Sequence, residues 1–287
     1  MTQPTVGVIG CGLMGSGIAE VFARAGRLVL VHEVDEAAAA RGRARVESSL
    51  ERAVSKGKLD AQVAEDALAS VTVGTDLEAL HDVGLVIEAA TEDEQLKTQM
   101  FGRLDQVVQR EDAILATNTS SIPIMKLGSV TRRPERVVGL HFFNPVPVLP
   151  LVEIVPSMLT SEQTVQDVHR ISTQELGKAV IRSPDRAGFI VNALLVPYLL
   201  SSIRMLESGF ASAEDIDAGM VRGCAHPMGP LQLADLIGLD TLSSIAESLY
   251  VEFKEPLYSP PPMLLRMVDA GLLGRKTGRG FYHYARS

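Results

Sequence analysis

The feature that most constrains the fold is a glycine-rich segment close to the N-terminus. A short β-branched run at residues 5–9 is followed directly by GCGLMGSG at residues 10–17. In this GxGxxG pattern, Gly10 and Gly12 allow a tight turn and a close approach of the backbone to a pyrophosphate, and Gly15 lets the next helix pack on the strand. We therefore expect a strand, a turn and a helix whose N-terminus faces the phosphates of a dinucleotide.

A second strand is predicted from Leu28 to Val31, and it leads to an acidic residue, Glu33. Glu33 follows the third glycine of the motif at roughly 20 residues, where a carboxylate accepts both ribose hydroxyls of the adenosine. Because that carboxylate repels a 2′-phosphate, the sequence favours NAD over NADP, with NADP as the alternative. The alternative is that the glycines serve only tight packing. That alternative does not explain the second strand and its terminal acid.

The segment from Asp35 to Ser70 is rich in Ala, Arg and Glu at helical spacing. It predicts a helical hairpin, coiled-coil-like and inserted into the α/β unit, with a break at Gly57. Polar and basic side chains gather near the break, namely Ser49, Arg52, Lys56 and Lys58. From the residues alone, a solvated helix face is the first interpretation and a phosphate-binding surface is the alternative.

The α/β pattern resumes with two buried strands, Gly84–Glu88 and Ala113–Thr117, around a helix at Asp93–Val108. In an open parallel sheet, ligands bind beyond the carboxyl ends of the strands. Polar side chains follow these two strands and are site candidates: Glu88, Asn118, Thr119, Ser120 and Ser121. For Ser121, the cap of the next short helix is the preferred interpretation.

A proline-rich stretch from Val138 to Val155 lies near the middle of the chain and contains His141, Asn144 and Glu153. Its prolines rule out a continuous helix, so we expect two extended segments joined by a bend. A buried carboxylate needs a partner, and a histidine on the neighbouring strand is a natural one. A histidine paired with a carboxylate is oriented for general acid–base chemistry, so we expect His141 to exchange a proton and Glu153 to orient it.

The chain changes character after a helix at Glu162–Leu176, a strand at Lys178–Arg182 and the sequence Ser-Pro-Asp at 183–185. We expect a Rossmann-type α/β domain at residues 1–184 and an all-α domain at residues 185–287. The helices expected in the second domain are Phe189–Ser208, Ala213–Met220, Leu231–Leu236 and Leu239–Phe253. Their apolar faces predict a self-association surface, and hence a homodimer. The tail, GRKTGRGFYHY, is interpreted as turn glycines with an aromatic anchor, and anion binding is the alternative.

Composition excludes several functional classes. The 287 residues carry a formal net charge of -8, which disfavours a nucleic-acid partner because that requires a broad basic surface. Two cysteines, Cys11 and Cys224, make neither a disulfide framework nor a zinc site, and no metal is expected. There is no apolar run of the about 20 residues that a membrane span needs. The expectation is a cytoplasmic protein that does not enter a membrane.

Several motifs occur in a characteristic order: GCGLMGSGIAE, EAATEDEQLK, ATNTSSIPI, GLHFFNPVPV, LVEIV, AGFIVNALLVPY, AHPMGPLQLADLIGLD and GRKTGRGFYHY. Over essentially its whole length, the chain resembles the L-3-hydroxyacyl-CoA dehydrogenase family. Within that family it is most like the free-standing bacterial 3-hydroxybutyryl-CoA dehydrogenases. The resemblance implies reversible oxidation of a (S)-3-hydroxyacyl-CoA to the 3-oxoacyl-CoA with a nicotinamide cofactor.

The resemblance also assigns roles to individual residues. It implies that His141 is the general acid and base and that Glu153 is its partner. Three residues occupy positions at which the family forms hydrogen bonds to the substrate carbonyl, to the catalytic histidine and to one another. They are Ser120, Asn144 and Asn192.

Two further groups of residues match the family's ligand-binding positions. Ser49 and Lys56 match contacts to the CoA moiety, which makes phosphate binding at the hairpin the favoured interpretation. The positions matched to the cofactor site are Gly10, Gly12, Leu13, Met14, Gly15, Glu33, Glu92, Lys97 and Asn118.

The sequence departs from the family pattern at three positions. Pro150 stands where many members carry Lys, Ala187 replaces the usual Pro, and Ala193 replaces the usual Arg. None of the three is in the His141–Glu153 pair. Because Ala193 follows Asn192 directly, the missing arginine bears on contacts at the substrate end or between the domains.

Two other functions remain as alternatives at this point. One is the same scaffold acting on a free hydroxy acid, as in the related lens crystallin and gulonate dehydrogenases, and Lys56 with its basic neighbours argues against it. The other is a non-enzymatic NAD-binding protein, which would have no use for an intact histidine–carboxylate pair.

Overall fold

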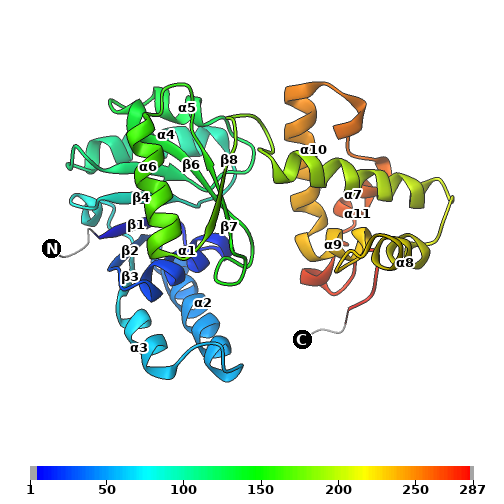
Figure 1. The fold of residues 1–287 in the computed structure, drawn as a ribbon, viewed down its shortest axis with the longest axis horizontal. Helices are drawn as coiled ribbons and strands as arrows, with labels where there is room; N and C mark the ends of the chain where they lie inside the picture. The colour runs from blue at the N-terminus through cyan, green and yellow to red at the C-terminus, as the bar shows by residue number, and fades with distance from the viewer. Residues whose placement is uncertain (1–4, 285–287) are drawn as a thin grey trace. The chain divides into compact units, whose positions relative to one another are not determined.

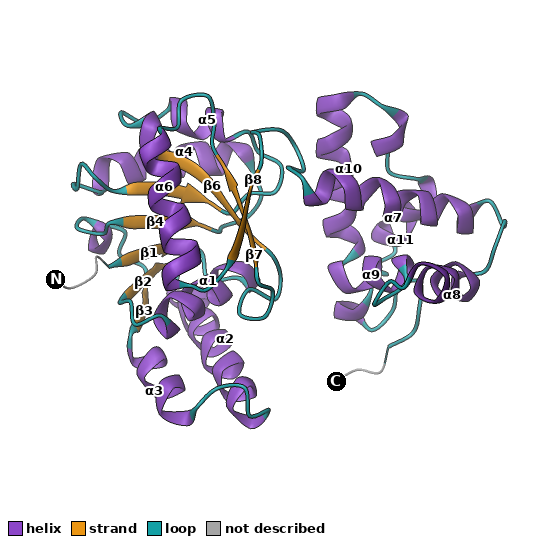
Figure 2. Ribbon diagram, in the orientation of Figure 1, coloured by secondary structure: helices purple, strands orange, loops and turns teal. Residues whose placement is uncertain are grey.

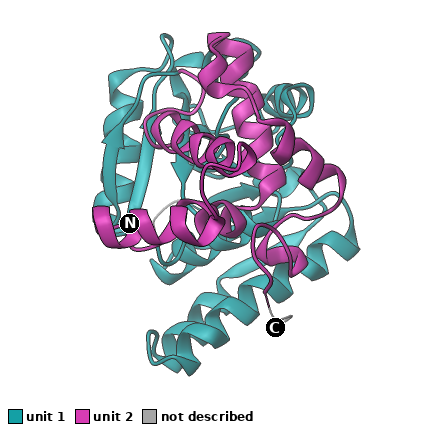
Figure 3. Ribbon diagram, turned by 90° about the vertical axis from the view of Figure 1, so that its right-hand side faces the viewer, with its two compact units in different colours: residues 1–185 teal, residues 186–287 magenta. Residues whose placement is uncertain are grey.

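The computed structural model describes residues 5–284 (Figure 1). The chain divides into two compact units, residues 1–185 and residues 186–287, which Figure 3 distinguishes by colour. Asp185, which we expected to open the second domain, lies in the first unit. Its carboxylate accepts the backbone N–H groups of Ile124 and Met125 at 2.8 and 2.9 Å, and this ties it to the first unit.

The first unit is built on one eight-stranded sheet with the strand order β3-β2-β1-β4-β5-β6-β7-β8 (Figure 2). The strands are β1 (Val6–Ile9), β2 (Val29–His32), β3 (Val71–Gly74), β4 (Leu85–Glu88), β5 (Ile114–Thr117), β6 (Val137–Phe142), β7 (Leu151–Val155) and β8 (Ala179–Arg182). Every neighbouring pair is parallel except β6 and β7, which are antiparallel.

The central strands are buried along their whole length, as helices on both faces of a parallel sheet require. All residues of β1, β4 and β5 are buried, and their sequences, VGVI, LVIE and ILAT, show no polar alternation. The helices of this unit are α1 (Leu13–Arg24), α2 (Glu36–Ser55), α3 (Ala61–Ala69), α4 (Glu94–Val107), α5 (Ile124–Ser129) and α6 (Glu162–Arg170). The expected Rossmann-type architecture is confirmed.

The expected helical hairpin is formed by α2 and α3, which extend away from the sheet (Figure 1). Asp35 caps α2 by accepting the N–H of Ala38, and Asp60 caps α3 in the same way. Between them, Gly57 has a φ of 64°, a left-handed conformation that glycine adopts without strain. Local sequence therefore determines both the helices and the turn.

Three features of the first unit differ from the sequence-based expectations. Strand β3 was not identified, and α6 ends at Arg170, where a π-helical turn at Ile171–Glu175 follows. The prediction that Ser121 caps α5 is wrong. The N-cap of α5 is Pro123, without a side-chain cap, because Asp185 accepts the first N–H groups of the helix.

The second unit is all helical and encloses its own apolar core. Its helices are α7 (Val191–Glu207), α8 (Ala213–Cys224), α9 (Pro230–Ile237), α10 (Leu239–Phe253) and α11 (Pro262–Asp269). Four of them match the expected positions, and α11 was not identified from the sequence. Within residues 5–284, no helix is both long and apolar enough to cross a membrane.

The tail of the chain is held in the second unit by a buried aspartate. Asp235, which is 1% exposed, accepts the N–H groups of Phe281 and Tyr282 at 3.0 Å and the hydroxyl of Tyr284 at 2.9 Å. The hydroxyl of Tyr282 also donates to the buried Asp217 at 2.9 Å. The interpretation of the tail as an aromatic anchor is confirmed.

Candidate functional site

The glycine loop leaves the N-terminus of α1 open to a ligand. Gly10 has a φ of 84°, and a Cβ on Gly15 would lie 1.9 Å from the Gly10 carbonyl oxygen, so both positions require glycine. The N-cap of α1 is Gly12, which provides no side-chain cap, and a Cβ added there would meet no atom within 4 Å. The N-terminus of α1, which begins at Leu13, thus has no side-chain cap and has open space at Gly12, as pyrophosphate binding requires.

Beside the glycine loop is a cavity of about 650 Å³, within the size range of small-molecule sites. Its lining includes Gly10, Gly12, Glu33, Lys97 and Arg103. Glu33 lies just past β2, and its Oε1 accepts the N–H of Cys11 at 2.5 Å, which fixes the carboxylate against the loop. These residues fit the dinucleotide predicted from the sequence. Arg103 is an exposed basic residue that the sequence reasoning missed, because nothing in its local pattern distinguishes it from other helix-surface arginines.

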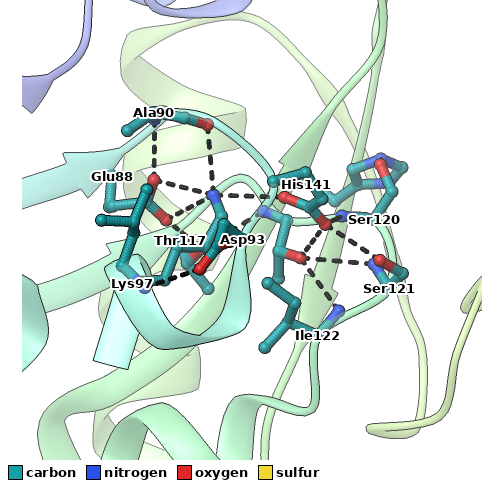
Figure 4. A network of polar contacts seen from close by, with 12 residues as sticks. Glu88, Ala90, Asp93, Lys97, Thr117, Ser120, Ser121, Ile122 and His141 are labelled. Carbon is teal, nitrogen blue, oxygen red and sulfur yellow. Dashed lines mark hydrogen bonds and ion pairs between the residues drawn. The ribbon is translucent and has the colours of Figure 1, made fainter. Parts of the chain in front are cut away.

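The end of β4 carries a buried ion pair (Figure 4). Lys97, 2% exposed, donates to both carboxylate oxygens of Glu88, 0% exposed, at 2.7 and 2.8 Å. The Glu88 carboxylate also accepts the Ala90 N–H and the Thr117 hydroxyl, each at 2.7 Å. The two buried charges therefore neutralise each other and are hydrogen-bonded, which compensates for much of the cost of removing them from water.

A second carboxylate, Glu92, links this ion pair to the turn after β5. Its Oε2 lies 3.2 Å from the Lys97 ammonium, and its Oε1 accepts the Ser120 N–H at 3.0 Å and the Ser121 hydroxyl at 3.1 Å. The Thr119 hydroxyl donates to the same oxygen. Burial by itself raises the pKa of Glu92, but Lys97 and these donors outweigh it and hold the pKa below its ordinary value of 4.5. The ionised carboxylate thus fixes the backbone of Ser120.

His141 and Glu153 are direct partners across the antiparallel pair β6–β7. They are 4% and 0% exposed, and His141 Nδ1 lies 2.7 Å from Glu153 Oε2. On the other side of the ring, His141 Nε2 lies 2.9 Å from the Ser120 hydroxyl. Because a carboxylate only accepts, Nδ1 carries the proton and Nε2 presents its lone pair toward Ser120. This arrangement is able to take up and return a proton at Nε2.

The three asparagines of the predicted site are placed differently. Asn118 Oδ1 accepts the Phe142 N–H at 2.8 Å, so its side chain joins the ends of β5 and β6. Asn144 is exposed after β6, and its side chain makes no hydrogen bond to His141 within the described residues. Asn192 belongs to the second unit, where it lies in the first turn of α7 and is 9% exposed. The first unit therefore unites Ser120, His141 and Glu153.

A separate cavity of about 480 Å³ lies between α2, the start of α1 and the bend after Asn144. Ser49 and Asn144 are among its lining residues, together with three arginines of α2, namely Arg41, Arg45 and Arg52. Lys56 is exposed at the C-terminal end of α2 and does not line this cavity. The sequence reasoning missed Arg41 and Arg45, although their spacing of four residues places them on one helix face.

The three departures from the family pattern have distinct surroundings. The Pro150 carbonyl accepts the Ala179 N–H at 2.7 Å, so proline is compatible with the pairing of β7 and β8. In the second unit, the buried Ala187 donates its N–H to Glu252 at 2.9 Å, and Ala193 donates to the Gly188 carbonyl at 3.0 Å.

Comparison with known proteins identifies the family of this chain. Residues 5–186 match the sequence model of the 3-hydroxyacyl-CoA dehydrogenase NAD-binding domain, and residues 188–284 match that of the C-terminal domain. A 3-hydroxybutyryl-CoA dehydrogenase of Mycobacterium tuberculosis is 59% identical over 279 residues, which cover 97% of this chain and 98% of that protein. The human mitochondrial hydroxyacyl-coenzyme A dehydrogenase is 41% identical over 97% of this chain and 90% of that protein.

Solved structures agree with this result. The crystal structure of FadB2 from M. tuberculosis superposes with a TM-score of 0.97, at 58% identity over 99% of this chain and 100% of that chain. The (S)-3-hydroxybutyryl-CoA dehydrogenase of Ralstonia eutropha gives a TM-score of 0.91 at 46% identity, covering 99% of each chain. The chain belongs to the 3-hydroxyacyl-CoA dehydrogenase family.

Proposed function

We propose that this protein catalyses the reversible oxidation of (S)-3-hydroxybutyryl-CoA to acetoacetyl-CoA with NAD. The observation that carries the proposal is the geometry of His141, whose Nδ1 is 2.7 Å from Glu153 and whose Nε2 is 2.9 Å from Ser120. Relatives that are named 3-hydroxybutyryl-CoA dehydrogenases support the choice of substrate.

In the direction of oxidation, His141 Nε2 accepts the proton of the C3 hydroxyl. When bound, NAD would supply the acceptor for the hydride that leaves the same carbon. Glu153 stabilises the resulting imidazolium and keeps its ring oriented, since its carboxylate is buried opposite His141. In the direction of reduction, the imidazolium donates this proton to the C3 oxygen as the carbonyl becomes a hydroxyl.

Ser120 positions the reacting oxygen. The Ser120 hydroxyl lies next to His141 Nε2, and the Ser120 N–H donates to Glu92. The hydroxyl, which is the donor, is therefore fixed before the substrate arrives. A fixed donor stabilises negative charge that develops on the oxygen at little reorganisation cost. We assign Asn144 to this substrate end, and for Asn192, in the second unit, we keep the substrate role that the family resemblance implies.

The arginines of α2 support a CoA thioester rather than a free hydroxy acid. Arg41, Arg45 and Arg52 line one cavity with Ser49, and guanidinium groups bind phosphates well. A free hydroxy acid carries no phosphate. We propose that this cavity accommodates part of the CoA moiety, with Lys56 as a further contact at the end of α2.

The test is an NADH oxidation assay with acetoacetyl-CoA, with free acetoacetate and without substrate. We expect turnover with acetoacetyl-CoA and a much lower kcat/KM with acetoacetate. The reverse preference would assign the protein to free hydroxy acids. No turnover with either substrate, together with intact NADH binding, would favour a non-enzymatic role.

We further propose that the protein is a homodimer assembled through its second unit and that it works in the cytoplasm. Large apolar side chains are exposed on this unit, among them Leu194 at 74%, Phe210 at 80% and Val251 at 58%. Cys224 is exposed and unpaired, as is usual in a reducing compartment.

A further inference from the structure

The bend between β6 and β7 carries part of the proposed substrate site. We call residues 145–149 the proline bend. It is closed by two hydrogen bonds, because the Val148 and Leu149 N–H groups donate to the Pro145 carbonyl at 3.0 and 2.9 Å. Asn144 immediately precedes the proline bend, and Pro145, Val146 and Pro147 line the 480 Å³ cavity.

The proline bend packs tightly on the start of α1. Val146 is 2% exposed, and a Cβ added to Gly17 would lie 2.9 Å from its Cβ. Two residues before the proline bend, the Phe143 ring contacts the His141 ring edge-on, with 4.7 Å between the centroids. A displacement of the proline bend would therefore be transmitted to Asn144 and to the environment of the histidine.

A buried lysine holds the proline bend in place. Lys178, just before β8, is 8% exposed, and its Nζ donates to the Val146 carbonyl at 2.6 Å and to the Leu149 carbonyl at 2.7 Å. Among residues 5–284, no carboxylate lies within salt-bridge distance of this ammonium. Burial and the nearby Arg24 lower the pKa of Lys178, which Glu20 partly offsets.

A buried cation without an acidic partner is costly, so its two carbonyl bonds need a structural purpose. Both acceptors belong to one five-residue bend, and both bonds are short. A neutral apolar side chain of similar size would fill the same space but would leave the Val146 carbonyl, which is buried, and the Leu149 carbonyl, which is partly buried, without this donor. The ammonium therefore fixes where the proline bend lies rather than merely filling volume.

We propose that Lys178 is a positioning residue for the substrate end of the site, acting through the proline bend on Asn144 and on the wall of the cavity. This inference rests on the proposed function, because it assigns the proline bend to substrate binding. Lys178 itself touches neither the substrate nor the cofactor.

The test compares Lys178→Met with Lys178→Arg and with the control Lys126→Met. Lys126 is a surface lysine, 54% exposed, that pairs with Glu94 and lines neither of the two cavities described above, so its replacement removes a positive charge outside the proposed binding cavities. For Lys178→Met we expect kcat/KM for acetoacetyl-CoA to fall by roughly 10-fold to 100-fold, because small displacements of positioning groups cost this much. The KM for NADH should stay within about twofold of the wild-type value, and Lys178→Arg, which keeps the donors, should recover most of the loss.

Circular dichroism and thermal unfolding establish whether each variant is folded. A folded Lys178→Met enzyme with wild-type kcat/KM would overturn the inference while leaving the proposed function intact. An equal loss of NADH binding would also overturn it, since that pattern indicates a general loss of structure. If Lys178→Met does not fold, Lys178→Gln and Lys178→Arg are compared instead, and equal activity of these two variants overturns the inference. A wild-type protein that does not act on acetoacetyl-CoA would overturn the proposed function itself.

Discussion

At the scale of single residues, His141 shows how strand register produces chemistry. Residues that face each other across an antiparallel pair have side chains on the same face of the sheet. The register that joins His141 to Glu153 therefore places an imidazole and a carboxylate in contact inside the protein, 4% and 0% exposed. A shift of one residue would send one of the two side chains to the opposite face.

The first prediction concerns His141→Ala. Removing the imidazole removes the group that lies 2.9 Å from the Ser120 hydroxyl and is placed to move a proton there, so turnover should fall by at least about 10²-fold. Binding of NADH, followed by fluorescence titration, should change little because the glycine loop is untouched. Turnover close to the wild-type value would refute the assigned role.

The second prediction concerns Glu33→Gln and cofactor choice. Glu33 lines the cavity beside the glycine loop and is held by the Cys11 N–H, so its charge lies where a 2′-phosphate would approach. Removing that charge leaves Arg103 as a cation in the same lining. The preference for NADH over NADPH, measured as a ratio of kcat/KM values, should therefore shrink by roughly 10-fold, or about 1.4 kcal/mol.

The matched control for this change is Glu65→Gln, which removes an exposed carboxylate from α3. It should leave the preference unchanged. If Glu33→Gln also has no effect on the ratio, the carboxylate does not set the cofactor preference of this enzyme.

At the scale of secondary-structure elements, long-range ion pairs tie helices to loops. Asp105 on α4 is 3% exposed and accepts hydrogen bonds from Arg132 and Arg133 at 2.8 and 2.9 Å. Burial by itself raises the pKa of Asp105, but these arginines outweigh it and hold the pKa below its ordinary value of 3.8. The carboxylate thus anchors α4 to the segment that precedes β6.

The third prediction follows for Asp105→Asn. A depressed folded-state pKa contributes stability that is present above the ordinary value of 3.8 and is lost as pH falls through the folded-state value. The variant should be less stable than the wild type by roughly 1–3 kcal/mol near neutral pH, since it loses charge-assisted hydrogen bonds. Urea unfolding at about pH 7 and about pH 3 should show this difference shrinking in acid. A difference that stays constant between the two conditions would contradict the assignment.

Elements with strong local signals were predicted well, and those without them were not. The glycine loop and the hairpin of α2 and α3 follow from spacing, capping aspartates and Gly57. By contrast, β3 has the four-residue sequence VTVG, and its place at the sheet edge comes from pairing with β2. The start of α5 depends on Asp185, about 60 residues away, so no local pattern near Ser121 could reveal it.

At the scale of the whole molecule, the chain combines an α/β unit that carries the proposed chemistry with a helical unit that carries exposed apolar surface. Within the second unit, Asp217 and Asp235 hold the C-terminal segment through backbone and tyrosine hydrogen bonds. The exposed apolar side chains of this unit are the surface that we propose for association with a second copy.

The fourth prediction concerns assembly. Light scattering after size-exclusion chromatography should give about twice the chain mass of 30.8 kDa, because a closed two-fold dimer buries the same apolar patch on both subunits. The mass should not decrease on dilution through the micromolar range. A mass of one chain at all concentrations would refute the dimer.

The sequence by itself determined the features that arise from short-range spacing. These are the strand, turn and helix at Gly10–Gly15, the acid at Glu33, the helical hairpin, and the change to an all-helical second half. Such features depend on backbone conformations that neighbouring residues impose, and they are legible without knowledge of the packing.

Only the tertiary structure decided which distant side chains meet. Three contacts join separate elements of the first unit. They are the ion pair of Glu88 with Lys97, the cavity that the arginines of α2 share with the proline bend, and the hydrogen bonds of Lys178 to that bend. The physical reason is that a buried charge is stable only beside its partner, and the choice of partner depends on how strands and helices pack. Sequence spacing identified the candidates, and packing selected the contacts.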